Sequence, residues 1–278
     1  MKYVYWGATA MIDQDYPLTE AQIDFYRTNG FVQLNDVITG AALQAFREAV
    51  AEAVATETPA EASAEPKTGY NSIFIQKVNL WQRHPKVSPF TLCRRFGNLA
   101  ARLAGMPMRL WHDQALFKEP RTGSKTPWHQ DTHYWPHREK KNQLSIWIAL
   151  QDATPENGCL SFLPGTQHLA HIQPVNLGHP QELKAIAPET RGLQAKMCPL
   201  KAGSCTFHNG FTFHYAGPNK TDAMREAFAI LYMPDGTTFN DHKHICTETL
   251  TGRERYEPSD KDFPKVSDVV FEEQMTQV

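Results

Sequence analysis

The sequence lacks several features that would assign a class of protein at once. It has no apolar run approaching the roughly 20 residues that cross a bilayer, and it has no internal repeat. Its charge is nearly balanced, with 28 Lys and Arg against 30 Asp and Glu, and no basic run is interleaved with aromatic residues. We therefore expect neither a membrane nor a nucleic acid as a partner. The N-terminal stretch has a short apolar part without a clear cleavage site, which favours mature protein over a signal peptide.

Cysteine is scarce and poorly arranged for a structural role. The five cysteines are odd in number, scattered and without CxxC spacing. This pattern argues against a disulfide framework or a zinc ribbon and favours reduced thiols in a cytoplasmic, bacterial protein. By contrast, the sequence has 12 histidines, and several of them crowd into 129–137 and 168–179. Histidine chemistry is therefore the feature to follow.

The first part of the chain is predicted to be helical. Within 17–57, Thr19 can cap a helix that stops at Gly30, and a second helix follows over 40–57 because apolar residues recur there at helical spacing. A further helix is predicted over 86–104. The intervening segment 58–69 is rich in Pro, Ala and Glu and is predicted to be a mobile loop.

Strands dominate from about residue 108. Short aromatic or β-branched runs, divided by Pro, Gly and Asn, indicate separate strands joined by long loops. This order favours a double-stranded β-helix (a jelly roll of cupin-like type) with flanking helices over alternating βαβ units. We predict one domain over 1–278, with helices within about 17–104, the β-helix core over about 108–233 and a polar extension over 234–278. The sequence does not indicate a role for that extension.

The segment WHQDTHYW at 128–135 carries the sharpest local signal. In an extended strand, residues i and i+2 face the same side, so His129 and Asp131 can reach one metal ion together. A neutral imidazole, a carboxylate and a distant second imidazole form a facial triad, which leaves positions on iron open for oxygen and a co-substrate. The pattern HxD alone is common, and a hydrogen-bonded His–Asp pair is its simpler explanation.

Two histidines compete for the distal position. His214 ends an aromatic strand and precedes an A-G-P-N turn, whereas His208 ends the preceding strand GSCTFHNG. Arg225 enters the apolar run AFAILYM. If Arg225 points inward, its planar guanidinium suits a bound dicarboxylic acid, although a surface arginine at a strand start is the simpler interpretation.

Four motifs together resemble the phytanoyl-CoA dioxygenase family. They are HQD with its following aromatic cluster, ENGCLSFLPGTQH at 156–168, H-x-A-G-P-N at 214–219, and the arginine that follows. The motifs occur in the right order across about 108–233, and the likeness extends more loosely to the N-terminal helices. The resemblance implies a double-stranded β-helix and an iron(II)/2-oxoglutarate-dependent dioxygenase that uses Fe(II), 2-oxoglutarate and O2. It implies a hydroxylase that converts 2-oxoglutarate to succinate.

Transferred residue by residue, the resemblance makes His129, Asp131 and His214 the iron ligands and the catalytic centre. It favours His214 over His208, because the family's distal ligand precedes the A-G-P-N turn. Arg225 would then grip the distal carboxylate of 2-oxoglutarate.

The strand before HxD is implied to contribute further contacts. Strand alternation places His112, Gln114 and Lys118 on one face, from which relatives draw contacts to 2-oxoglutarate or substrate. One departure concerns Ala216, since many relatives have a serine two residues after the distal histidine. A hydrogen bond to a charged group is worth about 1.5–3 kcal/mol. Either another polar group replaces that hydroxyl, or 2-oxoglutarate binds more weakly.

Substrate contacts are implied for an aromatic margin after HxD. Trp135 occupies a substrate-pocket position in relatives, and Tyr134 and His133 lie beside it, although a loop histidine at a polar rim explains His133 equally well. The aromatic margin and balanced charge favour a small or medium organic molecule over a polymer. The loop 58–69 and the Pro-rich insertion 173–195 are candidate lids. Neither the substrate nor the oligomeric state, monomer or homodimer, is fixed.

An alternative interpretation keeps the metal site and changes the chemistry. A cupin-like metal protein that does not use 2-oxoglutarate would retain the triad and leave Arg225 in solvent. A metal site alone does not fix the function.

Overall fold

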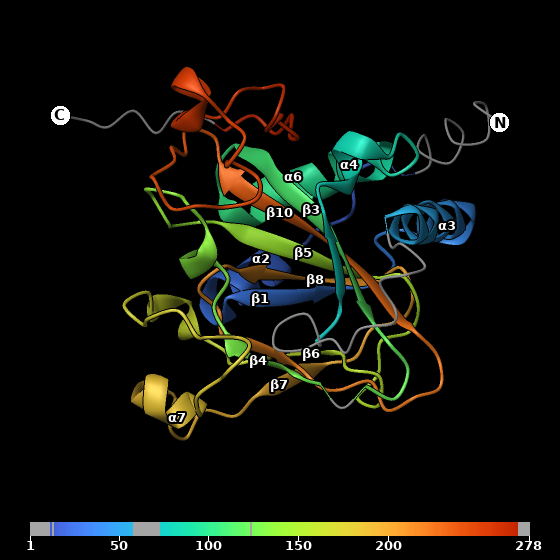
Figure 1. Cartoon of the computed structure of the whole chain (residues 1–278), viewed down its shortest axis with the longest axis vertical. Helices are drawn as coiled ribbons and strands as arrows, with labels where there is room; N and C mark the ends of the chain where they lie inside the picture. The colour runs from blue at the N-terminus through green and yellow to red at the C-terminus, as the bar shows by residue number, and fades with distance from the viewer. Residues whose placement is uncertain (1–11, 13, 58–72, 123, 272–278) are drawn as a thin grey trace.

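The computed structural model describes residues 12, 14–57, 73–122 and 124–271, so the predicted loop 58–69 lies outside the described residues. Within them, the strands form two antiparallel sheets that face each other (Figure 1). The larger sheet has the spatial order β1 (Phe31–Leu34), β8 (Cys205–Asn209), β5 (Leu144–Ala149), β10 (Arg225–Pro234), β3 (Met108–Lys118) and β2 (Ile75–Val78). The smaller sheet has the order β4 (Thr126–His129), β9 (His214–Ala216), β6 (Leu160–Phe162) and β7 (Lys196–Cys198). This arrangement confirms the predicted jelly roll.

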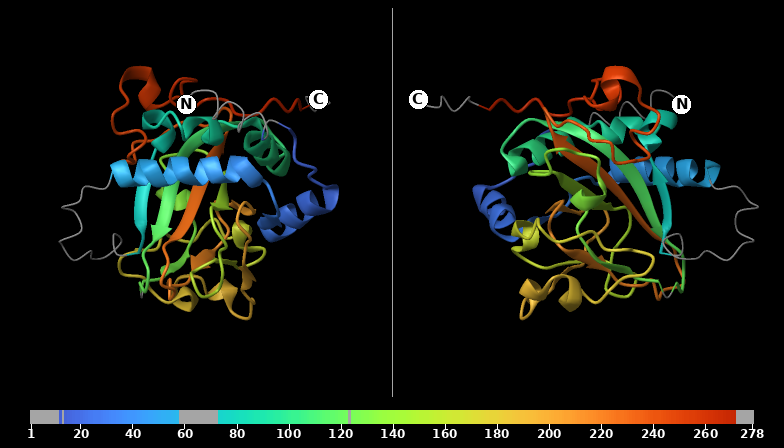
Figure 2. Two further views of the ribbon diagram at one scale, coloured as in Figure 1. Left: turned by 90° about the vertical axis from the view of Figure 1, so that its right-hand side faces the viewer. Right: turned by 60° about the vertical axis from the view of Figure 1, so that its left-hand side comes forward.

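Helices cover the outer face of the larger sheet. They are α2 (Glu20–Asn29), α3 (Gly40–Thr56), α6 (Arg94–Ala104) and the short α4 (Leu80–Arg83) and α5 (Ser88–Thr91), whereas the short α7 (Leu183–Ile186) packs with a separate apolar cluster. The left view of Figure 2 shows α3 running across the strands of this sheet. In the part of the chain that the structure describes, no helix combines the length and apolarity needed to span a membrane.

The first helix begins and ends where the sequence predicts. The Thr19 hydroxyl accepts a hydrogen bond from the Gln22 amide, and the Gln22 side chain accepts one from the Thr19 amide, which is a capping box. Gly30 ends the helix with a φ of 78°, a left-handed conformation that glycine adopts without strain. Local sequence therefore determines this element.

The predicted helix over 86–104 is wrong in one respect, because it is divided into α5 and α6. Cys93 between them is extended, with a ψ of 135°. The Thr91 hydroxyl donates to the Asp113 carboxylate at 2.7 Å, and the Trp81 amide donates to the same oxygen at 3.0 Å. These tertiary bonds anchor α4 and α5 on β3, and helical spacing alone does not reveal them.

The larger sheet separates two apolar cores. On β10, the side chains of Phe228, Ile230 and Tyr232 pack with the helices, whereas Ala229 and Leu231 belong to the core between the sheets. This alternation follows from strand geometry, in which successive side chains point to opposite faces. Small residues on the inner face leave room for a cavity.

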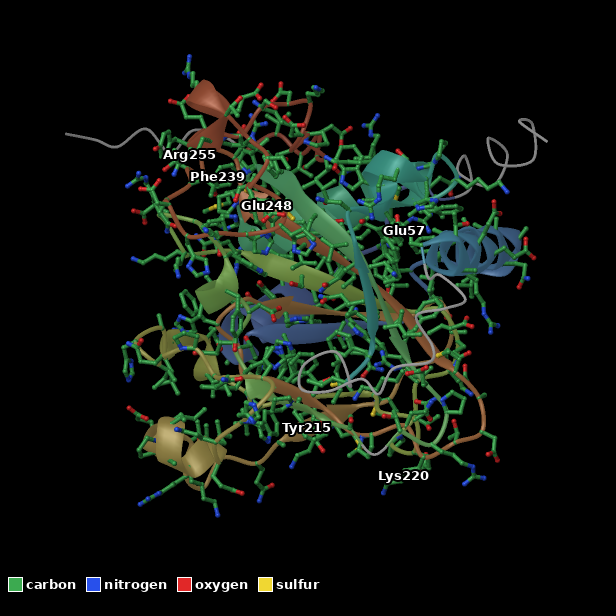
Figure 3. The ribbon with its side chains drawn as sticks, in the orientation of Figure 1. Glu57, Tyr215, Lys220, Phe239, Glu248 and Arg255 are labelled. Carbon is green, nitrogen blue, oxygen red and sulfur yellow. The ribbon has the colours of Figure 1, made fainter. Side chains whose placement is uncertain are left out.

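The polar extension closes one end of the inner core. Phe239 and Phe263 pack against Trp111 of β3, with ring centroids 5.4 Å and 5.3 Å away. The Arg109 guanidinium binds the Asp235 carboxylate at 2.5 Å and so ties the extension to the same strand. Figure 3 shows Phe239 beside the ends of β3 and β10, on the far side of the molecule from Tyr215 in the smaller sheet.

Candidate metal centre

A cavity of about 560 Å³ lies between the two sheets. Side chains from β3, β5, β8 and β10 line one wall, and side chains from β4, β6 and β9 line the other. The cavity contains the predicted triad, the predicted arginine and part of the Pro-rich insertion. The elements that carry these residues are far apart in the sequence, so the fold assembles the site.

The two predicted histidine ligands are cross-strand neighbours. His129 ends β4 and pairs in register with His214, the first residue of β9, and their ring centroids are 4.1 Å apart. Asp131 lies beyond the end of β4, with the α-helical φ and ψ of −69° and −44°, and begins a short 3-10 turn. The expectation that His129 and Asp131 share one face of an extended strand was therefore wrong in its geometry. The turn nevertheless brings the carboxylate to the same point.

The three side chains offer donor atoms around one point. Asp131 Oδ1 lies 3.3 Å from His129 Nε2 and 3.5 Å from His214 Nε2. Metal–ligand bonds of about 2.1 Å meeting near right angles put donor atoms roughly 3 Å apart. The spacing therefore fits a single metal ion, and these three residues form one of the groups of potential metal ligands within the described residues.

Backbone carbonyls orient both imidazoles. His129 Nδ1 lies 2.8 Å from the Pro127 carbonyl oxygen, and His214 Nδ1 lies 3.1 Å from that of Thr212. Because Nδ1 carries the proton in each case, the lone pair of Nε2 is directed toward Asp131. Such an outer hydrogen bond fixes the tautomer and the ring orientation of a metal-ligating histidine.

The charge states also suit a divalent cation. Burial opposes ionisation of Asp131, but the neighbouring imidazoles of His214, His129 and His208 outweigh it, so the pKa of the Asp131 carboxyl falls well below its ordinary value. Burial, with His129 nearby, lowers the pKa of His214 well below its ordinary value. At neutral pH the site therefore presents an anionic carboxylate and a neutral imidazole.

The second carboxylate oxygen of Asp131 is held by two other side chains. Ser145 Oγ and His208 Nε2 each lie 3.4 Å from Asp131 Oδ2. Ser145 and His208 are partners in the β5–β8 register, so the larger sheet presents both donors at one place. His208, the rival for the distal position, thus faces the outer oxygen rather than Oδ1, toward which His129 and His214 converge.

Arg225 lies on the same cavity wall and is only 2% exposed. Its guanidinium stands over the Trp147 ring, 5.1 Å from the centroid. Its Nε and Nη1 have no hydrogen-bond partner among the described residues. Burial lowers the pKa of Arg225 to about 10, so the group stays charged at neutral pH. A buried cation without a partner is costly, and an anionic ligand would relieve that cost.

The other predicted contacts on β3 divide into two groups. His112 and Gln114 line the cavity. Lys118 does not line it, and its ammonium donates to the Gly217 carbonyl at 2.6 Å. Lys118 therefore orders the turn after His214, and its predicted role toward 2-oxoglutarate stays a prediction.

Two of the three predicted substrate contacts after HxD line the cavity, and one does not. Trp135 and Tyr134 line the cavity, and the Tyr134 hydroxyl donates to the Val175 carbonyl, which fastens the Pro-rich insertion over the site. The insertion itself contributes lining residues over 175–178. His133 instead lies 2.9 Å from the Gln130 side-chain oxygen and packs on Phe211, outside the lining.

Sequence reasoning missed several polar residues of the cavity. Ser145 sits within the apolar strand LSIWIA, and Thr126 within a short loop-flanked strand, so neither has a pattern that separates it from core residues. His244 comes from the polar extension and also lines the cavity. The sequence HKHIC at 242–246, with two histidines and a cysteine close together, is the pattern that could have indicated His244.

Solved structures place the chain in a class. A non-haem alpha-ketoglutarate-dependent carbocyclase from nogalamycin biosynthesis, SnoK, superposes with a TM-score of 0.78 at 27% identity, covering 90% of this chain and 97% of SnoK. The epimerase SnoN, solved with Fe3+, alpha-ketoglutarate and nogalamycin RO, gives 0.68 at 26% identity over 86% of this chain and 97% of SnoN. The chain is an iron(II)/2-oxoglutarate-dependent oxygenase, as its residues predict.

The family follows from the sequence comparison. The family model for phytanoyl-CoA dioxygenase matches residues 26–227, and the chain belongs to the phytanoyl-CoA dioxygenase family. Peroxisomal phytanoyl-CoA dioxygenase of Homo sapiens is 25% identical over 251 residues, which cover 84% of this chain and 73% of the human protein. The predicted family is confirmed.

Proposed function

We propose that the protein hydroxylates a small or medium organic molecule and converts 2-oxoglutarate to succinate in the same turnover. His129, Asp131 and His214 would hold Fe(II), and Arg225 would bind the far carboxylate of 2-oxoglutarate. The observation that carries this proposal is the buried guanidinium of Arg225, whose Nε and Nη1 have no partner among the described residues. A cupin-like protein without 2-oxoglutarate would have no need of that buried charge.

The residues of the chain would act by orientation and charge. When bound, iron supplies the activation of O2, and 2-oxoglutarate supplies the electrons. Ser145 and His208 occupy Asp131 Oδ2, which favours coordination through Oδ1 alone and keeps positions on the metal free. Trp147 shields the Arg225 guanidinium on one face, and a charge pair is stronger where water is excluded.

Thr126 is the residue that we propose replaces the missing serine hydroxyl. It lies directly opposite Ala216 in the β4–β9 register, and both residues line the cavity. Thr126→Val should raise the 2-oxoglutarate concentration for half-maximal succinate formation by about 10- to 150-fold, the equivalent of 1.5–3 kcal/mol for a hydrogen bond to a charged group. Adding Ala216→Ser to that variant should restore most of the affinity. If Thr126→Val leaves the requirement unchanged, this assignment is wrong.

The lining favours a substrate whose reacting part is uncharged. Asp131 and Arg225 are the charged side chains among the described lining residues, and both have roles toward iron and 2-oxoglutarate. Two basic segments, 83–86 and 137–141, are the candidates to bind the phosphates of a CoA thioester, and Arg83 in the first already binds the Glu57 carboxylate at 2.7 Å. We therefore propose a neutral, partly aromatic or aliphatic substrate. The one-domain organisation, a monomer or homodimer and a cytoplasmic location stay predictions.

Oxygen-dependent succinate formation tests this function. The wild-type protein, loaded with Fe(II) and 2-oxoglutarate, should release succinate, and a library of neutral metabolites should contain compounds that stimulate the release. With 18O2, the hydroxylated product should carry one labelled oxygen, which distinguishes hydroxylation from the carbocyclase and epimerase reactions named for SnoK and SnoN.

Two histidine variants provide the matched comparison. His129→Ala should abolish succinate formation, whereas His171→Ala should not, because His171 lies on the surface and pairs with Glu189. Tight binding of zinc or nickel without any oxygen-dependent succinate would instead support the cupin-like alternative.

A further inference from the structure

A second group of potential metal ligands lies at the rim of the cavity. Donor atoms of His112, His244 and Cys246 all lie within 4.8 Å of one another. None of these residues belongs to the iron triad. His112 and Cys246 are buried, and His112 and His244 line the same cavity as the triad.

The fold brings this group together through a β-bulge. Leu231 of β10 pairs with His112, and Tyr232 pairs with Leu110, so Trp111 has no partner. A bulge of this kind shifts the alternation of side chains along a strand. As a result, Trp111 joins the inner core and His112 also lines the cavity, facing the polar extension. The extension returns over this point, and Figure 3 shows Glu248 in front of β3 and β10.

Neighbouring groups orient the three donors. His112 Nδ1 lies 3.2 Å from the Asp113 carbonyl oxygen, so Nε2 is the nitrogen available to a metal ion. The Asn79 side-chain amide donates to Cys246 Sγ at 3.5 Å, and an N–H donor of this kind stabilises a metal-bound thiolate. The Cys246 amide donates to His244 Nδ1 at 3.2 Å, which holds the i and i+2 side chains on one side of the loop. A metal ion bound at His244 Nδ1 would replace this hydrogen bond.

We propose that His112, His244 and Cys246 form a second metal site, for a thiophilic divalent cation of the zinc class. Two imidazoles and one thiolate are a donor set that zinc prefers, and three protein ligands leave a fourth position open to the cavity. The site is independent of the proposed iron function, because it shares no ligand with it. An ion bound there would fix the segment 240–247 to β3 beside the cavity.

Cobalt(II) is the probe that separates the two sites. The full-length, fully reduced protein is titrated with Co²⁺ without oxygen, and the near-ultraviolet thiolate-to-cobalt charge-transfer band is recorded. The iron triad contains no sulfur, so the band reports the second site alone. We expect the band in the wild type and in Asp131→Ala, which loses succinate formation, and its absence in Cys246→Ser. Cys198→Ser is the matched control, since Cys198 is buried in the smaller sheet and should leave the band intact.

The outer ligand gives a second readout. Asn79→Gly removes the donor to the sulfur and keeps the left-handed backbone that Asn79 adopts, with a φ of 57°. It should weaken Co²⁺ binding at this site by about 10- to 100-fold, the usual effect of removing an outer-shell partner. The proposal is overturned if folded wild-type protein shows no thiolate band, or if the band survives in Cys246→Ser.

Discussion

Alternate residues of β10 build two very different surfaces. Toward the helices, Phe228 and Ile230 are large and fully buried. Toward the cavity, Ala227 and Ala229 are small, and Arg225 is a buried cation at the start of the same strand. One face of the strand is therefore filled by apolar side chains, and the other keeps space and charge for a ligand.

The buried ionisable groups of the two faces differ in the same way. On the helix side, the Asp113 carboxylate accepts hydrogen bonds from Thr91 and Trp81 within the chain, and burial raises its pKa to about 7. On the cavity side, Arg225 has two nitrogens without such partners among the described residues. Asp113 Oδ2 therefore has two donors within the fold, whereas Asp113 Oδ1, like the two Arg225 nitrogens, has no partner among the described residues. The two groups differ in their surroundings, because Arg225 lines the cavity, where an anion can bind it, and Asp113 does not.

The largest expected effect on stability concerns the helix side. Phe228 packs on Phe46, with ring centroids 5.1 Å apart, so Phe228→Ala should lower the free energy of unfolding by about 3–5 kcal/mol. Iron and 2-oxoglutarate affinities should stay within about twofold. Ala229 is the next residue along and faces the cavity. Ala229→Leu should fill the cavity and suppress substrate-stimulated succinate release, while the free energy of unfolding changes little. Urea denaturation measures the free energy of unfolding of each variant, and succinate assays measure its activity. If both variants lose stability and activity to the same extent, the two faces of β10 do not differ in the way described.

Arg225→Met should affect 2-oxoglutarate more than stability. Removing one partner of a buried charge pair costs about 2–5 kcal/mol, so the 2-oxoglutarate requirement should rise at least about 30-fold. The free energy of unfolding of the ligand-free protein should not fall, because the variant removes an unpaired buried charge. Arg47→Met is the control, since it breaks the half-exposed pair with Glu226 on the helix side. A large loss of stability with unchanged 2-oxoglutarate affinity would make Arg225 a structural residue.

The outer contacts of Asp131 should have a smaller effect. The double variant Ser145→Ala with His208→Ala removes both groups near Asp131 Oδ2, and iron(II) affinity should fall by about 10- to 100-fold. Thr206→Val, on the strand of His208, is a control at a buried hydroxyl. Equilibrium dialysis with Fe(II) measures both. Equal iron(II) affinities in the wild type, the double variant and Thr206→Val would show that the contacts to Asp131 Oδ2 do not contribute to iron binding.

A further prediction is a pH dependence of stability that arises on the helix side. The folded-state pKa of Asp113, about 7, lies above its ordinary value of 3.8, so between these values the folded state binds more protons than the unfolded state. The Asp113 contribution to stability is complete below about pH 4 and declines as pH rises toward 7, with a slope of at most about 1.4 kcal/mol per pH unit. Asp113→Asn should lack this decline. Urea titrations at several pH values compare the two, and parallel curves would mean that Asp113 ionises normally.

Local patterns predicted most of this architecture. The capping box at Thr19, the strands from Met108 onward and the pair of His129 and Asp131 are visible in the local sequence, whereas His214 was favoured over His208 only by the family resemblance. They are visible because helical spacing, strand alternation and the HxD motif are each encoded within a few residues. The break at Cys93 is not, since hydrogen bonds from distant residues position α5.

The finer parts of the site escaped prediction for a common reason. His133 was predicted to be either a substrate contact or a loop histidine, and the 3-10 turn after Asp131 places it beside Gln130, outside the cavity lining. The bulge at Trp111 similarly directs His112 toward the polar extension. Ser145 acquires its contact only from the pairing of β5 with β8. Turns, bulges and cross-strand partners depend on tertiary contacts, and periodicity does not report them.

The most direct test of the iron centre is an anaerobic titration of the protein with Fe(II) and 2-oxoglutarate, followed by visible absorption. A 2-oxoglutarate molecule that chelates triad-bound iron gives a weak charge-transfer band. We predict this band in the wild type, its loss in Asp131→Ala, and its appearance only at much higher 2-oxoglutarate in Arg225→Met. A correctly folded wild-type protein that shows no band at saturating Fe(II) and 2-oxoglutarate would contradict the assignment of His129, Asp131, His214 and Arg225.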